Sequence, residues 1–162
     1  MALGKTHEAI NLILLPAALY FVPKGFYFSF TLGYILGTFF LSPDIDIKHS
    51  KPSKRWRYMR FIWIPYQKGS RHRGFSHIPI VGTFIRLLYL NLSIVFLYFI
   101  LIGVLRYTSP ELSNIFISFD ADRLLEHMAK KESAFFFLLG LIASEAFHVL
   151  LDIASTTLKR IL

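Results

Sequence analysis

With 162 residues the chain has room for one domain, and apolar residues make up 54% of it while charged residues make up only 17%. Soluble globular proteins carry roughly 25% charged residues, so this composition indicates a membrane protein rather than a soluble domain. A formal charge of +8 suits contact with anionic lipid, phosphate-bearing substrates or nucleic acid, and the absence of cysteine excludes disulfides and thiolate metal ligands.

The first apolar stretch covers residues 9–23. It is short for a transmembrane helix and would cross a bilayer only if it started near His7 or if the bilayer thinned locally. Pro16 and Pro23 are expected to kink or end it. A secretory signal peptide is the alternative, because a weakly basic start precedes the apolar run.

A second stretch, residues 25–43, contains no charged residue and has 19 residues, close to the ~20 that a spanning helix needs. Pro43 is expected to end this helix and to leave Asp44 and Asp46 in an irregular segment that can wrap an ion. The alternative is that the two carboxylates simply stop or cap a helix.

The connection over residues 47–73 carries nine Lys and Arg residues and no acid, which predicts a cytoplasmic location. Both tryptophans lie within residues 54–68, interleaved with other aromatic and basic residues. We expect this basic aromatic loop to lie in the lipid head-group layer. Stacking on single-stranded nucleic acid is the alternative.

Two histidines then precede the third span, residues 87–105, which is also free of charge. In the sequence HRGFSH, Gly74 permits a sharp turn that would bring His72 and His77 toward a common centre. The following segment, residues 106–133, is predicted to lie outside and to contain a short amphipathic helix over residues 120–132.

The fourth span, residues 134–157, is apolar except for Glu145, His148 and Asp152. Spacings of three and four residues place these side chains on one helical stripe, and ionisable residues inside a span suggest a functional site. Alternatively, Glu145 and Asp152 form structural ion pairs with Arg73 or Lys159. The Glu145–His148 pair also matches half of a di-iron motif, but the sequence has no second such pair.

These elements predict an all-α, single-domain membrane bundle of about four transmembrane helices, with both termini on the cytoplasmic side of the cell's inner or plasma membrane. All four spans then bring metal-ligand residue types to one layer. Imidazole and carboxylate ligands favour Zn²⁺, with Mn²⁺ or Fe²⁺ as alternatives. The predicted metal ligands are His7, Asp44, Asp46, His72, His77, His148 and Asp152.

Four short motifs carry a family resemblance: KTH at 5–7, PDID at 43–46, HRGFSH at 72–77 and HVLLD at 148–152. In this order they resemble the YdjM-like family of membrane-bound metal-dependent hydrolases, and most closely an uncharacterised metal-binding branch of it. That family is distantly similar to zinc-dependent phospholipase C and to the single-strand-specific zinc nucleases. The resemblance implies ligation of one or two ions by the residues above, with Asp44 or Asp46 contributing.

The preferred hypothesis is hydrolysis of a phosphoester, in a phospholipid head group or similar compound, at the cytoplasmic face of an anionic lipid membrane. Arg73, with Arg71, would hold the phosphate. The predicted catalytic residues are Asp44, Asp46, Arg73 and Glu145. Three alternatives remain: a non-catalytic metal-binding membrane protein, a nuclease-like phosphodiesterase, and a soluble helical domain that buries the apolar runs in its own core.

Overall fold

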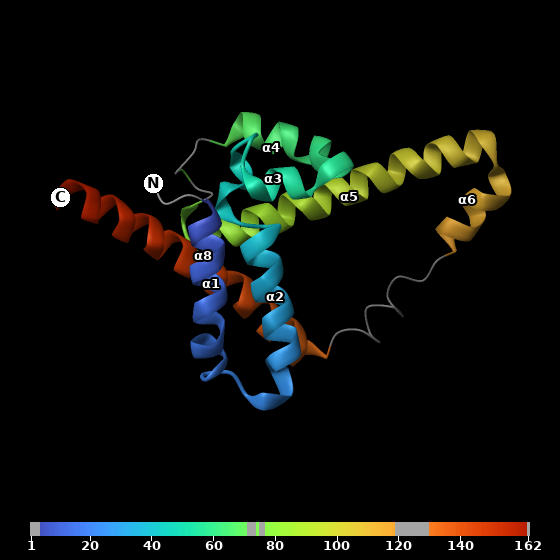
Figure 1. Ribbon diagram of the computed structural model, residues 1–162. Helices are drawn as coiled ribbons and strands as arrows, with labels where there is room; N and C mark the ends of the chain where they lie inside the picture. The colour runs from blue at the N-terminus through green and yellow to red at the C-terminus, as the bar shows by residue number, and fades with distance from the viewer. Residues whose placement is uncertain (1–3, 71–73, 75–76, 119–129, 162) are drawn as a thin grey trace.

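The structure is a computed structural model that describes residues 4–70, 74, 77–118 and 130–161, with side chains described from His7 to Thr157 within those ranges. Every regular element in this part of the chain is helical, which confirms the all-α fold (Figure 1). Most of the amphipathic helix expected over residues 120–132 lies outside the described residues.

Three helices pack together as one unit of the molecule. Helix α1 (Gly4–Leu19) and helix α2 (Tyr27–Phe39), which follows the short η1 (Lys24–Phe26), lie side by side as a hairpin, and α8 (Lys131–Ile161) passes across them (Figure 1). Phe30 and Tyr34 of α2 are buried in the core between these helices. The three helices are thus held by one shared apolar core.

Small residues allow α2 and α8 to approach closely. A Cβ atom at Gly33 would lie 2.9 Å from the backbone carbonyl carbon of Phe137, and one at Gly140 would lie 2.8 Å from the backbone nitrogen of Tyr34. Side chains at these positions would therefore collide with the main chain of the neighbouring helix. Small residues spaced by four are the usual means of close helix contact in membranes.

Buried hydrogen bonds fix α1 against this pair. The Asn11 side chain donates to the backbone carbonyl of Ser144 at 3.1 Å, and the Tyr34 hydroxyl donates to the backbone carbonyl of Asn11 at 2.9 Å. Because buried polar groups are costly when unpaired, these bonds define the register of the three helices.

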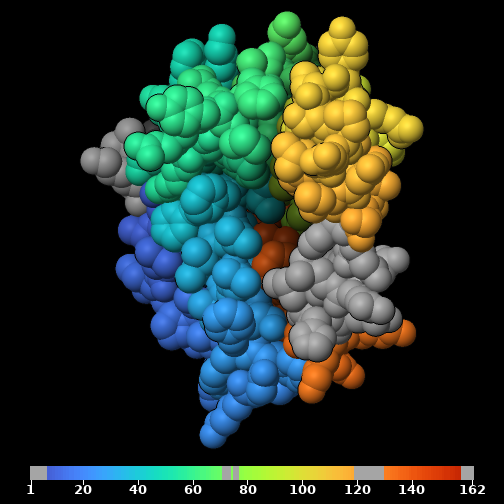
Figure 2. All heavy atoms as spheres, turned by 90° about the vertical axis from the view of Figure 1, so that its right-hand side faces the viewer, coloured from blue at the N-terminus to red at the C-terminus, as the bar shows by residue number. Residues whose placement is uncertain are grey.

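The predicted basic loop is itself mostly helical. Over residues 47–70 it contains α3 (Lys51–Arg55), η3 (Arg57–Trp63) and α4 (Ile64–Gly69), and η2 (Pro43–Asp46) comes directly before it. We call residues 43–69 the cap. Figure 2 shows it above the α1–α2 hairpin.

The aromatic residues of the cap divide into two groups. Trp63 is fully buried and packs with Ile45 and Tyr66 in a second small core, which differs from the expected position of its ring in the head-group layer. Tyr58, by contrast, is 95% exposed, and Phe61 is also exposed. Of these residues, only Tyr58 and Phe61 have the exposure expected at a membrane interface.

Helix α5 (Val81–Thr108) leaves the other helices and ends at the short α6 (Pro110–Ile117) (Figure 1). It begins directly after Ile80, whose φ of 72° and ψ of −63°, with a Val81 N–H to Pro79 carbonyl hydrogen bond of 2.9 Å, define a strained γ-turn. This turn reverses the chain between His77 and α5.

Three segments are long and apolar enough to cross a membrane: Lys24–Asp46, Val81–Thr108 and Lys131–Thr157. The first expected span corresponds to a shorter apolar helix, His7–Leu19. In the three long segments, 33%, 0% and 28% of the most apolar windows are buried within the protein. The apolar runs are therefore not covered by a core of their own, which argues against the soluble alternative.

Candidate metal centre

Four parts of the chain bring histidine and aspartate side chains to one place. His7 is the fourth residue of α1, Asp44 and Asp46 lie in η2, and His77 lies just before α5. His148 and Asp152 lie one turn apart on α8. Pro43 at the start of η2 supports the tight 3-10 turn that presents both carboxylates.

The distances show how closely these groups converge. His148 Nε2 lies 3.6 Å from Asp44 Oδ2 and 3.8 Å from Asp152 Oδ2. His7 Nε2 lies 3.5 Å from Asp152 Oδ1, and the His7 and His148 rings stack with centroids 4.6 Å apart. His77 faces Asp44 at 3.7 Å through Nε2.

The other ring nitrogen of His77, Nδ1, lies 3.8 Å from Oδ2 of Asp46. The three histidine side chains are nearly buried, at 5%, 7% and 9% exposure for His7, His148 and His77. Asp44 and Asp152 are more open, at 25% and 17%. Solvent therefore reaches the cluster mainly from the side of these two carboxylates.

These separations suit a shared cation better than direct hydrogen bonds. They exceed the ordinary N–H···O range of about 2.7–3.2 Å. Two ligand atoms on one zinc ion, each about 2.0–2.2 Å from it, lie roughly 3.3 Å apart at a tetrahedral angle and at most about 4.4 Å apart. In addition, His148 Nε2 is buried without a hydrogen-bond partner among the described residues.

The charge balance points the same way. In the described part of the chain, the ion pairs of Asp44 and Asp152 are with histidines alone. Neutral imidazoles leave these carboxylates uncompensated, and a divalent cation would offset their charge. No group of three or more His, Asp or Glu among the described residues is placed so that it could hold a metal ion as it stands, so metal binding would require these side chains to move.

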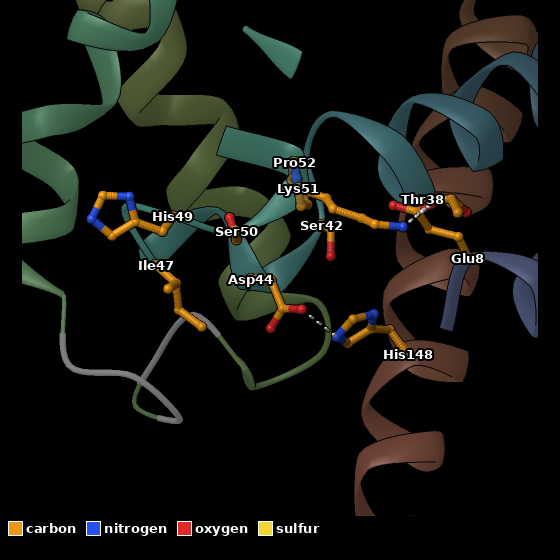
Figure 3. A pocket seen from close by; sticks show the side chains of 10 residues that line it. All are labelled: Glu8, Thr38, Ser42, Asp44, Ile47, His49, Ser50, Lys51, Pro52 and His148. Atoms are coloured by element: carbon orange, nitrogen blue, oxygen red, sulfur yellow. Dashed lines mark hydrogen bonds and ion pairs between the residues drawn. The ribbon is translucent and has the colours of Figure 1, made fainter. Parts of the chain in front are cut away.

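A cavity of about 280 Å³ adjoins the cluster. Asp44 and His148 point toward one another at its wall (Figure 3). Glu8, Lys51 and His49 also line the cavity. The cluster is thus reachable by a small ligand.

Glu145, predicted as a catalytic residue, has a different setting. It is 3% exposed, forms a 2.8 Å ion pair with Arg86 of α5 and accepts a hydrogen bond from the Thr83 hydroxyl. Arg86 also contacts Tyr66 of α4, and burial raises the pKa of the Tyr66 hydroxyl. Arg73 and Lys159, which the sequence offered as partners of Glu145, lie outside the described side chains, and among the described residues Glu145 pairs with Arg86.

Arg86 is the residue that sequence reasoning missed. It is the single charged residue between Gly74 and Leu105, and a lone charge at the edge of an apolar run signals a buried partner. Two predicted site residues, His72 and Arg73, lie outside the described residues, as does Arg71.

The fold and the cluster together define a helical protein with three segments able to cross a membrane and a buried histidine–aspartate cluster near their ends. The chain belongs to the family of uncharacterized metal-binding proteins DUF2227, whose model matches residues 2–162. A relative from Aquifex aeolicus (strain VF5), described as an uncharacterized protein, is 45% identical over 142 residues, covering 86% of this chain and 98% of the relative. No solved structure matches the chain significantly.

Membership in this family agrees with the resemblance of the sequence motifs to an uncharacterised group of metal-binding proteins. It gives no metal identity and no enzymatic activity, so the choice of Zn²⁺ and the hydrolase assignment stay predictions.

Proposed function

We propose that the protein is a membrane-bound, metal-dependent hydrolase of phosphoesters with its metal centre at the cytoplasmic face. The observation that carries this proposal is the convergence of histidine and aspartate side chains from four separate parts of the chain, at N···O distances of 3.5–3.8 Å. Apolar surface on α5 and the net charge of +8 support residence in an anionic membrane.

Within the cluster, Asp44 is the central ligand because it faces both His77 and His148. His7 and Asp152 complete the α1–α8 side. A bound divalent ion, most simply Zn²⁺, would supply a Lewis acid that polarises a phosphoryl oxygen and makes water more acidic. His72 remains a predicted further ligand.

Residues at the cavity beside the metal centre would bind the substrate. The 280 Å³ cavity leads to Asp44 and His148, and Lys51 at its wall can contact an anionic group. Arg73 remains the predicted clamp for the phosphate. Glu145 orients the start of α5 through Arg86 and Thr83, and we assign it a positioning role, one turn from His148.

A non-catalytic metal site is the second candidate. The near-complete burial of the three histidines favours it, since structural sites are closed whereas catalytic sites keep an open position. The cavity beside Asp44 and His148 favours the catalytic proposal. Bound metal without turnover of any phosphoester would support the second candidate.

Metal analysis of the detergent-purified protein tests both. We expect one or two equivalents of divalent metal in the wild type and loss of at least one equivalent in His148→Ala. His49→Ala is the matched control, because His49 lines the same cavity but is exposed and has no carboxylate partner among the described residues. Full metal content in His148→Ala would overturn the site.

Turnover is measured on the same samples with a chromogenic phosphodiester and with phospholipid vesicles. The hydrolase proposal requires activity in the wild type and in His49→Ala, and none in His148→Ala. Activity that survives the His148 substitution would contradict it.

A further inference from the structure

A second, open cavity of about 400 Å³ lies on the cap, and every described residue that lines it is a lysine or an arginine. These are Lys51, Lys54, Arg55 and Arg57. Lys51 also lines the cavity at the metal centre, so the two cavities are neighbours. Cations grouped around one hollow repel one another, and an anion bound there would reduce this repulsion.

Only part of this charge is neutralised. Glu8 of α1 accepts hydrogen bonds from Arg55 at 2.8 and 3.0 Å and from Lys51 at 3.3 Å. Lys54 and Arg57 are exposed and have no carboxylate within ion-pair distance in the part of the chain that the structure describes. The hollow therefore keeps a net positive charge.

The cavity is also held in place by local structure. Arg55 donates to the backbone carbonyl of Phe39 at 3.1 Å and lies 4.6 Å over the Phe39 ring. The Ser50 side chain caps α3 by accepting from the Ser53 N–H at 3.3 Å. Arg57 has a φ of 46°, an uncommon conformation for a residue other than glycine, and such strain often marks a functional position.

We propose that this basic cavity binds a phosphate group. Guanidinium and ammonium groups are the usual partners of phosphate oxygens, and Arg55 is preorganised by its contacts with Glu8 and Phe39. Because Lys51 lines both cavities, the phosphate belongs to a ligand that also reaches the metal centre. This last step rests on the proposed function, whereas phosphate binding itself does not.

Such a group could belong to a lipid head group or to a soluble phosphate compound. The exposed apolar side chains Tyr58, Met59 and Phe61 follow Arg57 directly, and they could enter the acyl boundary of a lipid layer. For this reason the experiment compares a soluble probe with a lipid probe.

The test uses the purified full chain in detergent. Binding of inorganic pyrophosphate and of short-chain phosphatidic acid is measured by calorimetry at low ionic strength, for the wild type and for Lys54→Gln/Arg57→Gln. The charge-matched control is Lys24→Gln/Arg106→Gln, whose residues are exposed and lie outside the cap. The cap variant removes two exposed cationic contacts and should bind roughly tenfold more weakly, which corresponds to about 1.4 kcal/mol.

A tenfold loss confined to the cap variant supports the proposal, and the probe that binds more tightly identifies the source as lipid or soluble phosphate. Absence of binding to either probe in the wild type, or equal affinity in the cap variant and the control, would overturn it. In an active enzyme the cap variant should raise KM by the same factor and leave kcat unchanged. An inactive wild type that still binds phosphate would refute the hydrolase proposal and leave this one standing.

Discussion

The close approach of α2 and α8 predicts that Gly140→Ala destabilises the protein. A Cβ atom at this position would lie 2.8 Å from the Tyr34 backbone nitrogen and closer still to the Phe30 carbonyl oxygen. Ordinary contacts of a Cβ atom begin near 3.4 Å, so the helices must separate by at least about half an ångström. Main-chain atoms cannot rotate away, unlike the end of a flexible side chain.

The size of the effect follows from two opposing contributions. Overpacking a well-packed contact costs about 1–3 kcal/mol. Because the obstructing atoms at Gly140 belong to the backbone, we expect a cost near the upper end, about 3 kcal/mol. Alanine is more favourable than glycine in a helix by up to about 1 kcal/mol. The net loss is about 2 kcal/mol, or roughly 30-fold in the folding equilibrium.

The assay is unfolding of the detergent-solubilised protein by denaturant, followed by circular dichroism. Gly103→Ala is the control, because Gly103 lies inside α5 and a Cβ there meets nothing within 4 Å. It should be neutral or slightly stabilising. If Gly140→Ala and Gly103→Ala unfold at the same denaturant concentration, the helices do not approach as closely as described here, and the reasoning fails.

Three further predictions concern the centre and its surroundings. Arg86→Met should cost about 3–5 kcal/mol because it removes the cation that pairs with the buried Glu145 carboxylate, and Glu145→Leu in the same chain should restore most of the loss, as measured by unfolding. Asp44→Asn should remove metal more completely than Asp46→Asn, since Asp44 faces two histidines, and metal analysis of both variants decides which aspartate is the better ligand. Ile80→Gly should not lower the free energy of unfolding, because relief of the left-handed backbone, about 1–2 kcal/mol, offsets the loss of a half-exposed side chain; a clear destabilisation would show that the turn is not strained.

The helical spans could be predicted from the sequence because an uncharged apolar run of about 20 residues rarely forms anything other than a membrane-spanning helix. The grouping of His7, Asp44, His77 and His148 also followed from the sequence, since each stands close to the end of an apolar stretch. Once such stretches are side by side, their ends share a layer. No tertiary detail was needed for that step.

Other features depend on tertiary contacts that a single sequence does not specify. A tryptophan flanked by Lys and Arg has the same pattern at a lipid interface and in a small core, so the burial of Trp63 was not predictable. The pairing of Arg86 with Glu145 depends on how α5 meets α8. The α2–α8 contact did leave a signal, because Gly33 and Gly37 are spaced as in other closely packed membrane helices.

The arrangement of the centre suggests why it is built from so many elements. His7 and His148 belong to the rigid unit of α1, α2 and α8, in which Asn11 and Ser144 fix the helix register. His77, by contrast, lies on the segment that leads into α5, and among the described residues α5 meets that unit mainly through Arg86 and Thr83, which both contact Glu145. A cation held between Asp44, His77 and His148 would therefore tie the start of α5 to the three-helix unit, to which the cap is already joined through Glu8 and Arg55. Metal binding is then coupled to the position of α5 relative to the three-helix unit, because His77 lies just before α5 whereas His148 belongs to the unit.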